Sequence, residues 1–163
     1  MAVNISDAEI AALIAEAKPL PDDYQKRVKT NPKRGHRERE LDIQGGNGSS
    51  FRLILRQSLF NPLDFSVILA WLHPQSATPF RLCRYNGKSH EHTNKLESQT
   101  FYDFHVHRST ARYQNSGLRE DSFAEPTNRY QDFGGALLCM IQECGFQQPA
   151  NPQTEFFQME GEP

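Results

Sequence analysis

Residues 50–74 read "SFRLILRQSLFNPLDFSVILAWLHP" and hold two segments with the hydrophobic pattern of β-strands. In the first segment Phe51, Leu53 and Leu55 point to one face, and Arg52 and Arg56 point to the other. This alternation is typical of a strand with one buried face. The second segment, 65–72, is apolar on both of its faces, which favours a central strand. The turn "NPLD" between them is short, so we expect the two strands to be antiparallel neighbours.

The period of two residues recurs on both sides of this pair, with turn-forming runs such as "GGNGSS" in between. Five segments are predicted to be strands or to contain one: 37–44, 50–60, 65–74, 80–87 and 100–113. Because short connections favour neighbouring antiparallel strands, we expect one antiparallel meander of about five strands.

Helical spacing replaces the strand pattern at both ends of the chain. Ser6 and Glu9 form the capping-box pattern S-x-x-E ahead of a periodic apolar run that ends at Pro19. Residues 130–146, "YQDFGGALLCMIQECGF", have an apolar stripe of helical period, and Gly145 suits the residue that follows a helix. The predicted fold class is α+β, with a C-terminal helix packed on the sheet.

The domain organisation follows from these patterns. Its expected parts are an N-terminal helix at 1–20, a basic linker at 21–36, a single α+β domain at 37–146 and a flexible C-terminal tail at 147–163. The segment 26–39 is the densest basic run, and it can either contact a nucleic acid or lie solvated.

The bulk properties describe one small domain. The chain has 163 residues, a formal net charge of −2 and a mean hydropathy of −0.70. Its longest apolar run, "VILAWL", is far shorter than the roughly 18 residues that span a membrane. Three cysteines without a C-x-x-C pair favour reduced thiols in the core. We therefore expect a soluble cytoplasmic protein with no membrane contact.

Four of the six histidines lie between residues 84 and 107, as the pairs His90/His92 and His105/His107. Side chains two apart on a strand share a face, so His105 and His107 are expected to point the same way. If the two segments pair through the loop between them, all four imidazoles approach one another.

Cleavage of RNA without a metal is the leading functional hypothesis for this cluster. The reaction needs an acid and a base, which histidine supplies near neutral pH, and a cation for the developing phosphorane charge. The catalytic candidates are His90, His92, His105 and His107. The candidates for binding RNA are Arg84, Tyr85, Lys88, Arg108, Arg112, Tyr113 and Arg119. This hypothesis requires no cofactor.

Three alternatives stay open. The H-x-H pairs suit a metal site with Glu97 or Asp103 as a carboxylate ligand, and "HEHTNKLE" matches the spacing of the cupin metal motif except for a displaced glycine. The chain can also be a non-enzymatic module that binds another protein through its N-terminal helix and a sheet edge. Lastly, the histidines can be ordinary surface residues.

Residues 113–129 have little periodicity and are expected to form a long loop. Its acids, Glu120, Asp121 and Glu125, are general-base or ligand candidates, although pairing with Arg119 and Arg129 is the favoured interpretation. Thr127 or Asn128 is the expected N-cap of the last helix.

The stretches "FRLCRYNGKSHEHTN", "FYDFHVH", "GLREDSFAEPTNRY" and "ALLCMIQECGF" resemble a family of small prokaryotic proteins that share a domain of unknown function. That resemblance covers roughly residues 50–146 and implies no activity. A looser similarity links Arg84, Tyr85, Asn86, His90 and His92 to the TumE-type toxins of toxin–antitoxin systems. It implies an RNA-directed toxin with a cognate antitoxin as partner, although the long N-terminal extension and the 113–129 loop depart from that pattern.

Overall fold

The computed structural model describes residues 3–149, and its centre is a seven-stranded sheet in which all neighbouring strands are antiparallel. Across the sheet the strands are β10 (Phe123–Pro126), β9 (His105–Arg108), β6 (Phe80–Asn86), β5 (Phe65–Trp71), β4 (Ser50–Ser58), β3 (His36–Gln44) and β2 (Asn31–Pro32). The predicted α+β class and antiparallel meander are confirmed, with more strands than the five expected.

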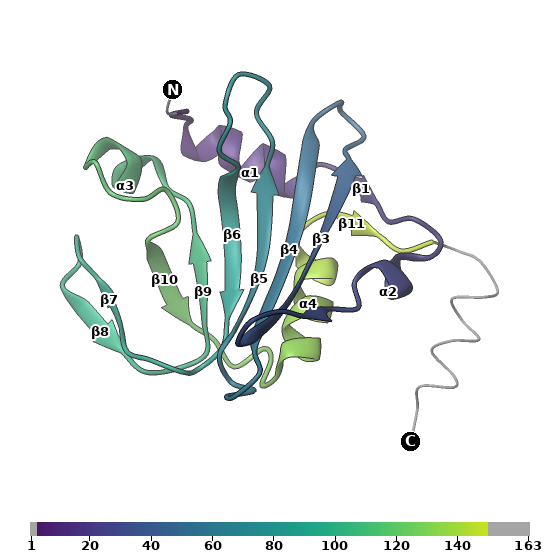
Figure 1. Ribbon diagram of the computed structural model, residues 1–163. Coiled ribbons are helices and arrows are strands. Elements are labelled where there is room, and N and C mark those ends of the chain that lie inside the picture. The colour runs from purple at the N-terminus through teal and green to yellow at the C-terminus, as the bar shows by residue number, and fades with distance from the viewer. Residues whose placement is uncertain (1–2, 150–163) are drawn as a thin grey trace.

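Two small sheets and four helices complete the described chain (Figure 1). The hairpin of β7 (His92–Asn94) and β8 (Gln99–Phe101) lies between β6 and β9 in the sequence. The strands β1 (Lys18–Pro19) and β11 (Phe146–Gln147) pair in parallel. The helices are α1 (Asp7–Ala15), α2 (Tyr24–Arg27), α3 (Ala111–Asn115) and α4 (Phe133–Glu143). None of them is long and apolar enough to cross a membrane.

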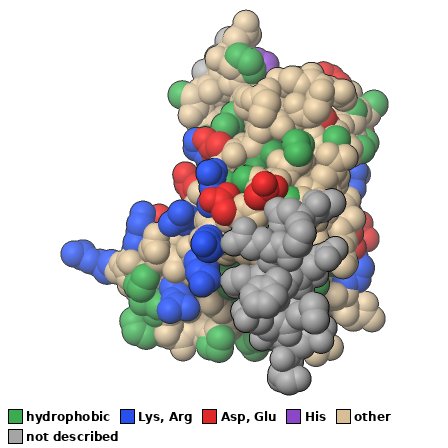
Figure 2. Space-filling model, turned by 90° about the vertical axis from the view of Figure 1, so that its right-hand side faces the viewer, with side chains coloured by type: hydrophobic (Ala, Val, Ile, Leu, Met, Phe, Trp, Pro, Cys, Tyr) green, Lys and Arg blue, Asp and Glu red, His purple; other side chains and the backbone are tan. Residues whose placement is uncertain are grey.

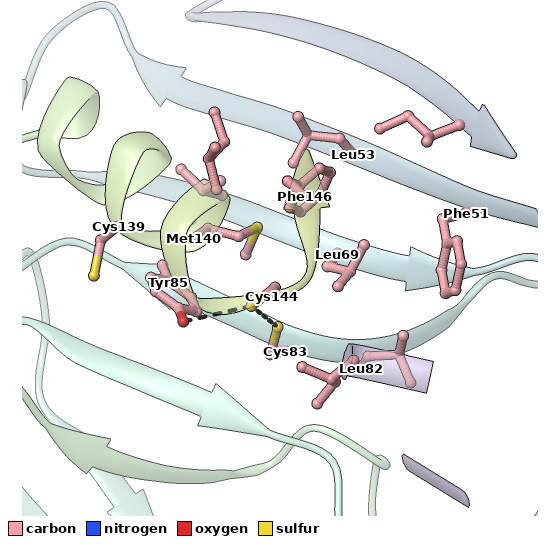
Figure 3. Packing of buried hydrophobic residues seen from close by; sticks show 14 of the residues in the cluster. Phe51, Leu53, Leu69, Leu82, Cys83, Tyr85, Cys139, Met140, Cys144 and Phe146 are labelled. Carbon is pink, nitrogen blue, oxygen red and sulfur yellow. Dashed lines mark hydrogen bonds between the residues drawn. The ribbon is translucent and has the colours of Figure 1, made fainter. Parts of the chain in front are cut away.

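The core lies on one face of the sheet, beneath α1 and α4. Figure 3 shows the side chains of Leu53 and Leu69 near Phe146, in the same cluster as Met140 of α4. As predicted, β5 is central, with three strands on each side. Its two faces are not equally buried, because Ser66 and Ile68 on the opposite face are only half-buried. That second face, which we call the open face, is covered by neither α1 nor α4 and can hold a site.

Lys18 ties the ends of α1 and α4 together from inside the core. Its side chain is fully buried, and Nζ donates to the carbonyl oxygens of Leu13, Ile14, Glu16 and Cys144 at 2.7–2.9 Å. These carbonyls lie at or near the C-terminal ends of the two helices, where a cation is favoured.

The predicted helix ends agree with the structure except at two places: α1 ends at Ala15 and not near Pro19, and the N-cap of α4 differs. The capping box of Ser6 and Glu9 is present, and Gly145 follows α4 with a φ of 78°. The N-cap of α4 is Asp132, whose side chain accepts from the backbone N–H of Gly135, and not Thr127 or Asn128. The expected cap was placed too early because the helix begins at Phe133.

Residues 100–113 are not one strand, which corrects the sequence prediction. The chain leaves β8 after Phe101, enters β9 at His105 and begins α3 at Ala111. The predicted loop 113–129 contains β10, which pairs with β9 along its whole length. Because β10 is an edge strand it tolerates Pro126, a residue that argues against a central strand.

The segment predicted as a basic linker at 21–36 contains α2 and β2. Figure 2 shows that Lys and Arg side chains gather toward one side of this view of the molecule, beside a group of acidic side chains. Gln147, at the start of the predicted tail, belongs to β11. The rest of that tail, from residue 150, lies outside the described residues.

Candidate functional site

Strands β6 and β9 carry the site because their side chains alternate between the core and the open face. Tyr85 of β6 points into the core, so its neighbours Arg84 and Asn86 point to the open face. The register pairs Arg84 with His107 and Asn86 with His105. Both histidines of β9 therefore lie on the open face, as predicted.

The β7–β8 hairpin brings a third histidine to the same place. Asn94 of the hairpin is fully buried; its amide nitrogen donates to the carbonyl of Ala124 at 2.7 Å, and its Oδ1 accepts from the Ala124 N–H at 2.9 Å. These two bonds fix the direction of the amide. Oδ1 of Asn94 therefore accepts from Nε2 of His92, 2.8 Å away, which orients the His92 ring and leaves Nδ1 as its lone-pair nitrogen.

Three imidazoles meet on the open face, and we call them the histidine triad. One ligand nitrogen from each of His92, His105 and His107 lies within 4.8 Å of the other two. The ring centroid of His92 lies 5.4 Å from that of His105 and 4.8 Å from that of His107. His90 is exposed at the rim, with its ring centroid 6.2 Å from that of His105. The four histidines do approach one another, as predicted. Three of them form a tight group, and the His90 ring lies at its periphery.

Backbone carbonyls set the tautomers of the two buried histidines. Nδ1 of His105 lies 2.7 Å from the carbonyl oxygen of Asp103, and Nδ1 of His107 lies 2.7 Å from that of Asp121. A carbonyl only accepts, so Nδ1 carries the proton in both rings and Nε2 keeps its lone pair in the neutral form. Nε2 of His105 is buried and has no hydrogen-bond partner among the described residues.

Both rings stay neutral at physiological pH. Burial, helped by the neighbouring histidines and Arg84, lowers the pKa of His105 to about 4. Burial and then the positive charge of Arg84 lower the pKa of His107 to about 2. Neutral imidazole is the form that binds metal ions, whereas a general acid needs the protonated form.

Asp121 holds the main cation of the site. Its side chain is fully buried, and Oδ2 accepts from Nε of Arg84 at 3.1 Å. Arg81 and Arg119 lie at 3.6 and 3.4 Å from the same carboxylate. The buried carboxylate therefore fixes Arg84 beside the triad while the rest of its guanidinium remains free to bind.

Two members of the triad, His92 and His107, lie at the wall of a hollow of about 280 Å³, which we call the histidine hollow, and His105 is buried behind them. The lining of the hollow includes His90, His92 and His107. Three cations, Arg84, Lys95 and Arg119, line it as well, and no carboxylate of residues 3–149 does. The hollow thus joins ligand nitrogens to a positively charged surface, which suits a negatively charged molecule.

The remaining predicted RNA-binding residues are distributed differently. Arg84 and Arg119 line the histidine hollow, as expected. Tyr85 and Tyr113 are buried, so neither ring is free to stack on a base, which corrects that prediction. Both tyrosines are buried because their hydroxyl groups have partners inside the protein: Tyr85 donates to Glu143, and Tyr113 donates to Glu97.

Three other predicted cations lie away from the triad. Arg108 follows His107 on β9, so its side chain leaves the sheet on the other face. Lys88 lies over the ring of Tyr102, with 5.6 Å between Nζ and the ring centroid. Arg112 forms an ion pair with Glu97.

The carboxylates proposed as metal ligands do not join the triad. Glu97 is bound by Tyr113 and Arg112, and the side chain of Asp103 is exposed while its backbone carbonyl serves His105. The spacing shared with the cupin motif therefore does not describe this site, whose ligands come from β7 and β9.

No protein-family model, curated protein or solved structure matches this chain. The similarity to the TumE-type toxins and to the prokaryotic family stays a prediction. The function is therefore argued from the chain's own residues.

Two positioning residues, Asn94 and Tyr130, escaped the sequence analysis, and the role of Asp121 was predicted only in part. Asn94 lies in a segment read as a uniformly polar loop, and Asp121 pairs with Arg119 as expected but also with Arg84 and Arg81. The hydroxyl of Tyr130 lies 2.7 Å from the carbonyl of Asn86 and 2.9 Å from that of His105, and so links β6 to β9 beneath the triad. For Asp121 a further signal was the length of loop 113–129, which is unusual for a connection without structure, whereas Asn94 and Tyr130 lie outside that loop.

Proposed function

We propose that the protein is a metal-dependent hydrolase whose single divalent ion is bound by His92, His105 and His107. The observation that carries this proposal is the convergence of three imidazoles, one of which presents a buried nitrogen without a partner. The candidate ligand nitrogens lie within 4.8 Å of one another, so the three rings would have to move closer together to bind one ion.

The surroundings of the ligands support a metal more than a hydrogen-bonded histidine cluster. Metal-ligating histidines usually donate their other N–H to a carbonyl or carboxylate, and His105 and His107 both do so. Three imidazole ligands favour zinc or another late first-row ion over calcium or magnesium. A tetrahedral ion with three protein ligands keeps one position for water, whose pKa the ion lowers toward neutrality.

The chain's own residues then divide the remaining work. His90 lies exposed at the rim, where it can exchange protons between the hollow and the solvent. Arg84 offers guanidinium donors to an anionic substrate. The metal-independent mechanism is less well supported, because burial lowers the pKa of His105 and of His107 and so disfavours the protonated form that a general acid needs.

Metal analysis of the purified protein tests this proposal directly. We expect about one zinc, cobalt or nickel ion per chain after loading, and a rise in thermal stability on loading, because the ion binds the folded state alone. The double variant His105→Ala/His107→Ala should lose both effects. The matched controls His90→Ala and His73→Ala, which change an exposed and a half-buried histidine outside the triad, should keep them. Absence of stoichiometric binding in the wild-type protein would reject the function.

A further inference from the structure

A second hollow adjoins the first on the open face of the sheet. It has a volume of about 460 Å³, and Ser66 is among its lining residues, whereas Asn86 lines the histidine hollow. These two residues are cross-strand partners in β5 and β6, and Oγ of Ser66 donates to Oδ1 of Asn86 at 2.8 Å. One hydrogen-bonded pair therefore separates the two hollows.

The charge of the two hollows taken together is strongly positive. The lining cations are Arg84, Lys95 and Arg119 on one side of the pair and Arg34 and Arg56 on the other. The lining carboxylate is Asp64. Among residues 3–149, Arg34, Arg56 and Lys95 take part in no ion pair, so their charges are available to a ligand. Cations spread over two adjoining hollows favour an extended polyanion over a single small anion.

An exposed aromatic ring stands at the far end of this surface. Phe60, in the β4–β5 connection, is 86% exposed. Its ring lies beside Gly35, which lines the second hollow: a Cβ atom on Gly35 would be 3.7 Å from the ring. The backbone N–H of Leu59 donates to the carbonyl of Gly35 at 3.1 Å and holds the two segments together. Proteins that bind single strands combine such a ring, on which a base stacks, with a positively charged groove.

We propose that the substrate of the metal site is single-stranded nucleic acid. One phosphodiester lies in the histidine hollow beside Arg84, the strand crosses the Ser66–Asn86 pair, and a neighbouring base stacks on Phe60. This inference rests on the proposed function for its chemistry. In the hydrolysis the oxygen of water bonds to phosphorus, the bond from phosphorus to the leaving sugar oxygen breaks, and the two water protons go to a base in the hollow and to the leaving oxygen.

Fluorescence anisotropy with the full chain, loaded with zinc, tests the binding. The probes are a labelled single strand of about twelve nucleotides, as RNA and as DNA, and the same sequence as a duplex. We expect the single strand to bind at least tenfold more tightly than the duplex, because only unpaired bases can stack on Phe60. Phe60→Ala and Arg56→Gln should each weaken binding about tenfold.

The controls change residues of the same type elsewhere on the surface. Leu138→Ala and Lys26→Gln remove an exposed apolar and an exposed basic side chain from α4 and α2, and both should bind like the wild type. Inorganic phosphate and a mononucleotide should compete only at far higher concentration than the oligonucleotide. Equal binding of strand and duplex, or an unchanged affinity of Phe60→Ala, would overturn the inference.

The two proposals fail in different ways. Zinc uptake without strand binding rejects the nucleic-acid substrate and leaves the metal site intact. Strand binding by a protein that takes up no metal rejects the hydrolase and supports the binding surface, because Phe60 and Arg56 do not depend on the ion.

Discussion

Asp121 and His107 are joined by a hydrogen bond of 2.7 Å from Nδ1 of the imidazole to the backbone carbonyl of the aspartate. The side chain of the same aspartate binds Nε of Arg84 at 3.1 Å. One residue therefore fixes the tautomer of a candidate ligand through its backbone and the position of the neighbouring cation through its side chain. The two functions can be separated by substitution, because only the second depends on the carboxylate.

Asp121→Asn should destabilise the fold and weaken strand binding more than metal binding. Loss of a fully buried carboxylate leaves three arginines without their shared partner, a change that costs about 3 kcal/mol. Urea unfolding measures this cost, and metal titration of the folded variant should give nearly wild-type affinity since the carbonyl remains. Asp103→Asn, an exposed change, is the control and should stay within about 0.5 kcal/mol of the wild type. A variant that loses metal affinity while it remains folded would contradict this division.

Asn94→Ala should lower the affinity for metal without removing a ligand. The substitution deletes the acceptor that orients His92 and both bonds that attach the hairpin to Ala124. Loss of such a supporting residue typically costs between about 10-fold and 100-fold in metal affinity. Isothermal titration with zinc measures it, and Asn128→Ala, at an exposed asparagine, should be neutral. Unchanged affinity would mean that the hairpin is held in place by other contacts.

Gly145→Ala should destabilise the protein by about 3 kcal/mol. At this position φ is 78°, and a Cβ atom would lie 2.5 Å from the carbonyl oxygen of Glu16 and 3.0 Å from those of Ile14 and Ala15. Gly117→Ala separates the two causes, because Gly117 has a φ of 74° and open space around it. The free energy of unfolding of this control should fall by only about 1 kcal/mol, which is the cost of a positive φ for alanine. Equal losses in the two variants, measured by chemical denaturation, would show that the contact with α1 is not what makes glycine necessary.

Lys18 should make the stability rise with pH in the alkaline range. Burial lowers the pKa of Lys18 to about 8, below the ordinary lysine value of 10.5. Between these two values the unfolded chain binds more protons than the folded protein, so the free energy of unfolding increases with pH, by about 3 kcal/mol in total. In Lys18→Met this increase should disappear, whereas Lys26→Met, at an exposed lysine, should retain it. Denaturation series from pH 7 to about 10 test the sign, since parallel curves for wild type and Lys18→Met would disprove the effect.

The sequence predicted the layered part of the fold because its signals are local. Alternation in 50–58 and 65–71 marked the central strands, and the capping box and Gly145 marked two helix ends. Which face of the sheet is buried was harder to predict from the sequence. An apolar residue such as Ile68 reads as buried, but only the assembled sheet shows that α1 and α4 cover the same face and leave Ile68 half-exposed.

The candidate site was predicted in its residue types and not in its chemistry. Spacing alone placed His105 and His107 on one face of a strand. Their neutrality could not be read from the sequence, because it arises from burial and from the positive charge of Arg84, and their tautomers are set by the carbonyl groups of Asp103 and Asp121. The interior positions of Tyr85 and Tyr113 likewise depend on partners more than fifteen residues away along the chain. A cognate antitoxin or another protein partner stays a prediction.

The triad is divided between strand β9 and the β7–β8 hairpin, and the hairpin is held in the fold by fewer contacts than the strand. His105 and His107 belong to a strand with neighbours on both sides, whereas His92 belongs to a two-stranded hairpin that is held by Asn94 at Ala124 and by Glu97 at α3. An ion held by all three would leave as soon as the hairpin swings away and lowers its coordination. The residence time of the metal would then report the opening rate of the hairpin, and a bound strand lying across both units would slow the exchange of the ion with solvent.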